Sequence, residues 1–180
     1  MYRYLFSPIT IHGLALRNRI AYPSLGLLYS YDSKLNDRYY AFFKERAKGG
    51  AGIVTVGPVG IDDVGVGLAA LTIATDDVIP SFQKLTRIIK DEGARSFIQL
   101  FHAGAYAYPF LINNQQPIAP SAIYCHYSKT TPRKMTTEDI EQVKHAFADA
   151  GLRAVEAGFD GVEIIASARY SCAFAASACV

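Results

Sequence analysis

Small and polar residues follow four short apolar runs of the sequence, and they are the candidates for chemistry. Gln99 carries a hydrogen-bond donor and an acceptor, which suits the edge of a heteroaromatic ring. Gly26 and Gly57 let a ligand approach the backbone closely, because glycine has no side chain. We predict that a planar heteroaromatic ligand fits the whole set, which comprises Pro23 to Gly26, Val56 to Pro58, Gln99 with His102, and Ile165 to Tyr170.

Each of these residues also has a structural interpretation. An isolated Gln at a strand end more often bonds backbone groups than a ligand, and a lone histidine such as His102 is more often structural. Ser24 and Gly57 would fit any loop. The residues alone therefore predict a ligand site without naming the ligand.

The apolar runs are predicted strands, separated by predicted helices. The run AGIVTV, bounded by glycines, is typical of a strand buried on both faces. Three amphipathic segments begin at capping residues and end at glycines, as helices do. Predicted strands span residues 19–23, 51–56, 96–100 and 161–165 after a hairpin over 9–16, and predicted helices begin near Asn36, Thr75 and Thr136, the last with Asp139 as a capping box.

Alternation of apolar strands with helices predicts a parallel sheet covered by helices, because each parallel crossover needs a connecting element. A doubly wound sheet and a barrel both meet this requirement. No G-x-G-x-x-G follows the first strand, where PSLGLLYS stands instead. In a barrel, function lies at the carboxyl ends of the strands, where the candidate residues are placed.

Composition narrows the class of protein. The chain has 180 residues, which suits one domain, whereas a complete eight-stranded barrel needs about 250. The net charge of +2 includes no run of like charge, so neither nucleic acid nor a membrane is an expected partner. Three cysteines without a C-x-x-C pair indicate reduced thiols, a cytoplasmic location and no metal site.

Several stretches, in order, resemble the old yellow enzyme family of NADH:flavin oxidoreductases. They are LFSPITIHGLALRNRI, YYAFFKERAKGGAGIVTVG, IQLFHAG, IAPSAI with TPRKMT, and AVEAGFDGVEI, and together they span about residues 5–168. HAGAYAYP and ASARY, which lacks a histidine pair, resemble the 2,4-dienoyl-CoA and 2-enoate reductase branch. The resemblance implies the first four βα units of an FMN-binding (β/α)8 TIM barrel over residues 1–168, with an N-terminal hairpin.

The resemblance also implies site residues and chemistry. Reduced FMN, supplied by NADH or NADPH, would reduce the C=C bond of a small enoyl or dienoyl substrate. Tyr170 matches the family's proton donor, and a tyrosine is neutral at pH 7 and can act as a general acid. The residues implied for FMN are Ser24, Leu25 and Gly26 along the ring, Gly57 and Pro58 near its pyrimidine edge, and Gln99 as a hydrogen-bond partner.

Three features depart from the family pattern. Ala105 stands where the family usually has Arg, and Gly57-Pro58 replaces a small-residue pair. Residues 169–180 match nothing, and we expect a truncated or frameshifted reading frame there. An iron–sulfur cluster is expected only in a longer parent protein, because this chain has no cysteine cluster.

Two functions stay open. The first is the N-terminal half of an FMN-dependent ene or dienoyl-CoA reductase. The second is a non-catalytic half-barrel that needs a partner or a second copy to fold or to bind flavin, because its open edge strands favour self-association. An aldolase would want a lysine at a strand end, and none of the four predicted strands supplies one.

Overall fold

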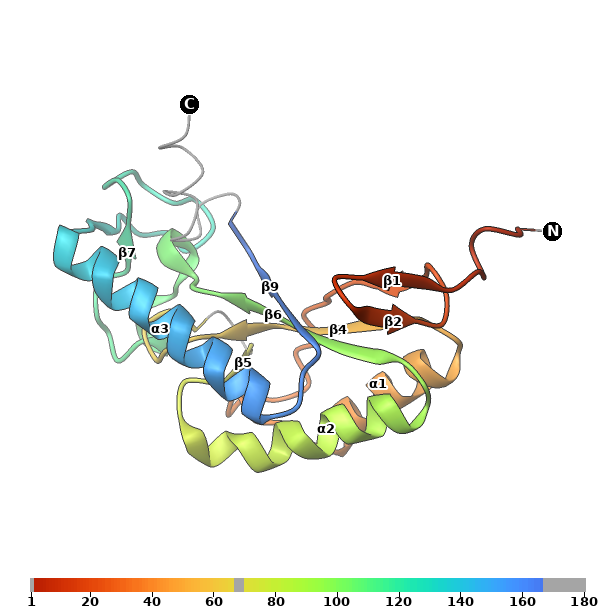
Figure 1. Cartoon of the computed structure of the whole chain (residues 1–180). Helices are drawn as coiled ribbons and strands as arrows, with labels where there is room; N and C mark the ends of the chain where they lie inside the picture. The colour runs from red at the N-terminus through yellow and green to blue at the C-terminus, as the bar shows by residue number, and fades with distance from the viewer. Residues whose placement is uncertain (1, 67–69, 167–180) are drawn as a thin grey trace.

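A parallel sheet forms the centre of the chain, whose computed structural model describes residues 2–66 and 70–166. Its strand order is β3-β4-β6-β9, and a short strand β5 pairs with the end of β4. The strands are β3 (Ala21–Tyr22), β4 (Ile53–Gly60), β5 (Leu71–Thr72), β6 (Arg95–Phe101) and β9 (Gly161–Ile164). An antiparallel hairpin precedes them, formed by β1 (Ile9–Ile11) and β2 (Leu14–Leu16), as predicted (Figure 1).

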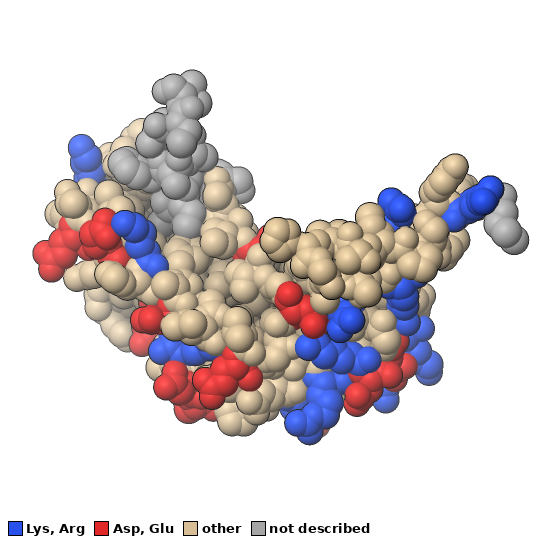
Figure 2. Space-filling view, viewed as in Figure 1, with Lys and Arg blue, Asp and Glu red and all other residues tan. Residues whose placement is uncertain are grey.

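Three helices connect neighbouring strands and pack on one face of this sheet. They are α1 (Asp37–Lys48), α2 (Ile79–Asp91) and α3 (Thr137–Glu156). The core between sheet and helices contains alternate strand residues, such as Val54, Val56 and Ile98, all fully buried. The opposite face has no helix in the described residues, and the surface there is hollowed beside the β1–β2 hairpin (Figure 2).

The helix ends follow the predicted local chemistry. The Asn36 side chain accepts hydrogen bonds from the N–H groups of Arg38 and Tyr39 at the start of α1. Thr136 and Asp139 form the predicted capping box of α3. The start of α2 lies beyond the predicted Thr75, because Asp76–Val78 form a 3₁₀ turn first.

The second strand of the sheet, predicted over residues 51–56, extends further than predicted. β4 continues to Gly60 and pairs with β6 on both sides of a register shift between Val56 and Val59. Gly57 and Pro58 therefore lie within the strand, at a bulge, and not at its end as predicted. Gly57 has φ +140°, a conformation that favours glycine, and this residue type lets the strand bend without ending.

The segment from Phe101 to Met135, predicted to be irregular, contains short regular pieces. Two 3₁₀ turns lie at Gly104–Tyr106 and Pro109–Leu111. A two-stranded parallel pair follows, formed by β7 (Ile118–Ala119) and β8 (Arg133–Lys134). Residues of this segment, such as Ile112, thus pack next to Phe101 at the carboxyl end of β6.

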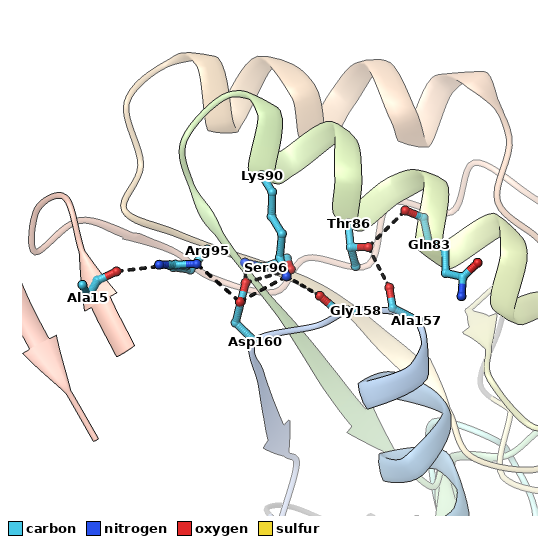
Figure 3. A network of polar contacts seen from close by, with 9 residues as sticks. All are labelled: Ala15, Gln83, Thr86, Lys90, Arg95, Ser96, Ala157, Gly158 and Asp160. Carbon is cyan, nitrogen blue, oxygen red and sulfur yellow. Dashed lines mark hydrogen bonds and ion pairs between the residues drawn. The ribbon is translucent and has the colours of Figure 1, made fainter. Parts of the chain in front are cut away.

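A polar network closes the amino-terminal end of β6 and β9 (Figure 3). Asp160 accepts hydrogen bonds from the Ser96 N–H at 2.9 Å and the Ser96 hydroxyl at 3.2 Å. The same carboxylate pairs with Lys90 at 3.1 Å and Arg95 at 3.7 Å. Polar groups at this end of a barrel serve stability, because function lies at the other end.

Arg17 fixes the hairpin to the helical layer. Its guanidinium donates to the carbonyl oxygens of Ala47 at 2.6 Å, Ala51 at 2.7 Å and Glu92 at 2.8 Å. Ala47 belongs to the last turn of α1, and Glu92 follows α2, where unpaired carbonyls favour a cation.

No helix of the described residues combines the length and apolar character needed to cross a membrane.

Candidate functional site

An apolar pocket of about 140 Å³ lies at the carboxyl ends of β3, β4 and β6. Four of its lining residues, Leu25, Gly26, Gly57 and Pro58, were predicted from the sequence. No charged side chain lines the described pocket, which suits a neutral, flat ligand. The other lining residues are Leu27, Leu28, Tyr39, Phe43, Ala70, Leu71, Phe101, Ala103, Tyr106 and Tyr127.

Ser24 and Gln99 both lie against Gly57, which is one of the residues that line this pocket. A Cβ added to Gly57 would lie 3.3 Å from the Ser24 Oγ, 3.1 Å from the Gln99 Cβ and 2.8 Å from the Gln99 carbonyl oxygen. Gly57 therefore leaves the space in which Ser24 and Gln99 approach each other. The structure brings together these three predicted residues, one from the segment after β3 and the others from β4 and β6.

The Ser24 hydroxyl is buried and has no hydrogen-bond partner among the described residues. A buried polar atom without a partner costs about 1 to 3 kcal/mol, so native proteins nearly always satisfy it. The polar edge of a ligand beside Gly57 would do so. This geometry fits the flavin that the sequence resemblance implies.

Gln99 lies on the sheet face opposite the helices, since its neighbours Ile98 and Leu100 are buried in the helical core. Its Nε2 donates a short hydrogen bond to Oε1 of Glu163 on β9. The two residues are opposite each other in the parallel register. Sequence reasoning missed Glu163, although strand alternation from Gly161 places it on this face.

His102 is structural in its contacts, one of the two interpretations that the sequence left open. Its side chain is 1% exposed, and Nδ1 accepts a hydrogen bond from the Gly104 N–H at 3.1 Å. The neutral ring therefore carries its proton on Nε2, which lies 3.6 Å from Asp62 Oδ2. Burial lowers the pKa of His102 and the Asp62 charge opposes this, so the ring is neutral at pH 7.

Ala105, which stands in place of the family arginine, is buried and follows the pocket residue Ala103. Its carbonyl oxygen accepts a hydrogen bond from the Ser128 hydroxyl at 2.7 Å. Next to it, the rings of Tyr106 and Tyr127 pack edge to face, with centroids 5.4 Å apart. Aromatic packing thus forms the pocket wall here.

The predicted proton donor, Tyr170, lies outside the described residues, as does the segment 169–180 that matched no family pattern. Ile165, at the end of the last strand, is described and packs beside the buried Phe101 group. Within residues 2–66 and 70–166, no three His, Cys, Asp or Glu side chains gather as metal ligands.

Comparison with known proteins shows which family this chain resembles. The profile of the NADH:flavin oxidoreductase / NADH oxidase family matches residues 4–172. A metal reductase from Desulforamulus reducens is 42% identical over 166 residues, which cover 92% of this chain and 25% of that protein. NADPH dehydrogenase from Bacillus subtilis is 36% identical over 173 residues, covering 94% of this chain and 50% of the relative.

Solved structures of family members have a similar fold. Morphinone reductase in complex with tetrahydroNAD has a TM-score of 0.85 at 26% identity, covering 91% of this chain and 49% of that one. A 2-naphthoyl-CoA reductase in complex with 2-naphthoyl-CoA has a TM-score of 0.87 at 28% identity, covering 94% and 28%. The chain thus spans half or less of the length of these relatives, and the predicted partial TIM barrel is confirmed. From its sequence profile and its fold together, the chain belongs to the NADH:flavin oxidoreductase / NADH oxidase family, which includes the old yellow enzymes.

Proposed function

We propose that this chain supplies half of an FMN site in an oxidoreductase that uses NADH or NADPH to reduce activated C=C bonds. One observation carries this assignment: the buried Ser24 hydroxyl has no partner among the described residues and lies, like Gln99, beside Gly57, which lines an apolar pocket. The family uses flavin, and a flavin ring has polar edge atoms that could bond the Ser24 hydroxyl. Both facts support FMN as the ligand. The same proposal includes a cytoplasmic location, where NADH and NADPH are available.

The residues of the chain have distinct roles in this site. Ser24 and Gln99 supply polar contacts to the edge of the ring, while Leu25 and Gly26 lie along it. Gly57 leaves β4 without a side chain where the flavin ring approaches, and Pro58 lies next to it near the pyrimidine edge of the ring. When bound, FMN supplies the hydride for the substrate carbon.

The substrate is an enoyl or 2,4-dienoyl compound, which includes a thioester to coenzyme A. Two observations support this choice: the described pocket has no charged lining residue, and a similar structure is that of a 2-naphthoyl-CoA reductase with its thioester ligand. Tyr170 is the proposed general acid that delivers a proton to the α-carbon, because a phenol is neutral at pH 7.

A second candidate function is a non-catalytic half-barrel that binds a partner or a second copy of itself. Apolar side chains are exposed at the β9 edge, with Val162 at 42% and Ile164 at 53%. On α3 beside it, Leu152 is 69% exposed and Val155 is 70% exposed. Exposed apolar groups next to an open strand favour association.

Two measurements on the purified full chain separate these functions. FMN is titrated into the chain while flavin fluorescence is followed, and dithionite-reduced samples are then given an enoyl substrate. Saturable binding with turnover that Tyr170→Phe abolishes supports the enzyme. Saturable binding without turnover, in a chain that light scattering shows to be dimeric, supports the second function. If FMN does not bind saturably, the flavin assignment is wrong.

A further inference from the structure

The side chains of Gln99 and Glu163 form a pair across neighbouring strands. The register of β6 and β9 places Gln99 opposite Glu163 and Phe97 opposite Gly161, all on the face away from the helices. The Gln99 Nε2 donates to the Glu163 carboxylate. The Cβ of Gln99 lies beside Gly57, which lines the pocket and also lies next to the Ser24 hydroxyl.

Packing below the pair fixes its position. A Cβ on Gly161 would lie 2.6 Å from the Phe97 ring, so only glycine leaves room for that ring beside β9. The ring therefore lies against the backbone of β9 at the position opposite Phe97. Glu163 is two residues further along the strand, and therefore its carboxylate reaches the Gln99 amide without a change of register.

The chemistry of the pair decides which way the Gln99 amide is turned. An ionised carboxylate only accepts hydrogen bonds, so it selects the NH₂ group of Gln99 as its partner. The Gln99 Oε1 accepts no hydrogen bond from the described residues and is the group left for a ligand. An acceptor in that place recognises a ring N–H.

We propose that Glu163 is a positioning residue that orients the Gln99 amide so that the site selects a flavin through its ring imide N–H. This role rests on the proposed FMN function and adds a selectivity to it. The ligand contact belongs to Gln99, and Glu163 acts only through that side chain. A ligand that excludes water strengthens the pair, because a hydrogen bond to a charge is stronger in a low dielectric.

A pair of probes tests this role without measuring turnover. FMN and its N3-methyl analogue, which lacks the imide N–H, are titrated separately into the full chain, and dissociation constants come from flavin fluorescence. We expect wild type to prefer FMN by about fivefold, the effect of one hydrogen bond. Glu163→Ala should remove most of this preference, because the amide is then free to turn.

Two further variants distinguish orientation from mere support of the fold. Glu163→Gln keeps an acceptor for the Gln99 NH₂ group and should retain most of the preference. Glu163→Lys offers only donors, attracts the Gln99 Oε1 and should abolish the preference for the N–H probe. Asp149→Asn, an exposed carboxylate of α3, is the matched control and should behave as wild type.

The outcomes separate the two levels of inference. If neither probe binds wild type saturably, the FMN function itself fails. If FMN binds but all four Glu163 and Asp149 variants show the wild-type preference, Glu163 does not orient Gln99. If Glu163→Lys and Glu163→Gln lose the preference equally, with melting temperatures below that of wild type, the residue serves stability and the orienting role is refuted.

Discussion

The backbone of Gly65 lies directly against the imidazole of His102. A Cβ at position 65 would be 2.5 Å from the His102 Cδ2, closer than any real contact of that kind. Gly65 also accepts a hydrogen bond from the Ala103 N–H at 2.8 Å. The loop after β4 is therefore fixed to the loop after β6, and Ala103 carries this contact to the pocket wall.

Gly65→Ala should lower the free energy of unfolding by about 2 kcal/mol, because the added methyl overpacks a site closed by a buried ring. It should also weaken FMN binding, since the wall at Ala103 must move. Urea denaturation and a flavin titration measure the two effects. Gly151→Ala is the control: nothing lies within 4 Å of its added Cβ, and helix propensity should stabilise the chain by about 1 kcal/mol.

The buried His102 should make stability depend on pH. Its folded pKa is lowered by burial, so below about pH 6.5 the unfolded chain binds a proton that the folded chain does not. The free energy of unfolding should therefore decrease as the pH falls from about 7.5 to 5.5. His102→Asn keeps an acceptor for the Gly104 N–H but cannot titrate. Urea midpoints of the two proteins should converge at the lower pH, and parallel curves would disprove the assignment.

Ser24→Ala should have opposite effects on stability and on ligand binding. Without FMN it removes a buried hydroxyl that has no partner in residues 2–66 and 70–166, so the free energy of unfolding should stay equal or rise. With FMN, affinity should fall by about fivefold, the effect of one hydrogen bond. Thr86→Val is the matched control: its hydroxyl donates to the Ala157 carbonyl at 2.7 Å, so only stability should fall. Equal FMN affinity in wild type and Ser24→Ala would place the flavin elsewhere.

Asp160→Asn should destabilise the chain by about 2 kcal/mol, because it removes the charge that Lys90 and Arg95 share while keeping the shape of the side chain. Thermal or urea unfolding measures the loss. Glu141→Gln is the control, since its ion pair with Lys144 is exposed and contributes less than about 1 kcal/mol. A similar small change in both variants would show that the Asp160 network is not a major source of stability.

Local chemistry made the helices predictable. Asn36 and the Thr136–Asp139 pair bond backbone groups within three residues of themselves, so their signals are complete in the sequence. The extension of β4 was not predictable in this way. Gly57 and Pro58 are poor strand formers, and their place in β4 depends on pairing with β6, about 40 residues later.

Some residues of the candidate site could likewise be predicted from the sequence, and others could not. The carboxyl-terminal parts of parallel strands lie near one edge of a sheet, and this rule predicts that Ser24, Gly57 and Gln99 come close together, although Gly57 and Gln99 lie within β4 and β6 and not at their ends. The walls formed by Tyr106 and Tyr127 come from a segment without periodicity, so no pattern marks them. Finding Glu163 requires the register between strands 64 residues apart, which only the folded chain supplies.

Arg17 also constrains the order in which the chain assembles. Its three carbonyl partners lie 30, 34 and 75 residues further along the sequence, at the end of α1, just before β4 and at the end of α2. Arg17, which directly follows β2, gains all of these bonds only after α1 and α2 have come together. Although β1 and β2 come first in the sequence, these bonds to Arg17 form only once α1 and α2 are in place, and slow amide exchange in the hairpin would report that this part of the fold is complete.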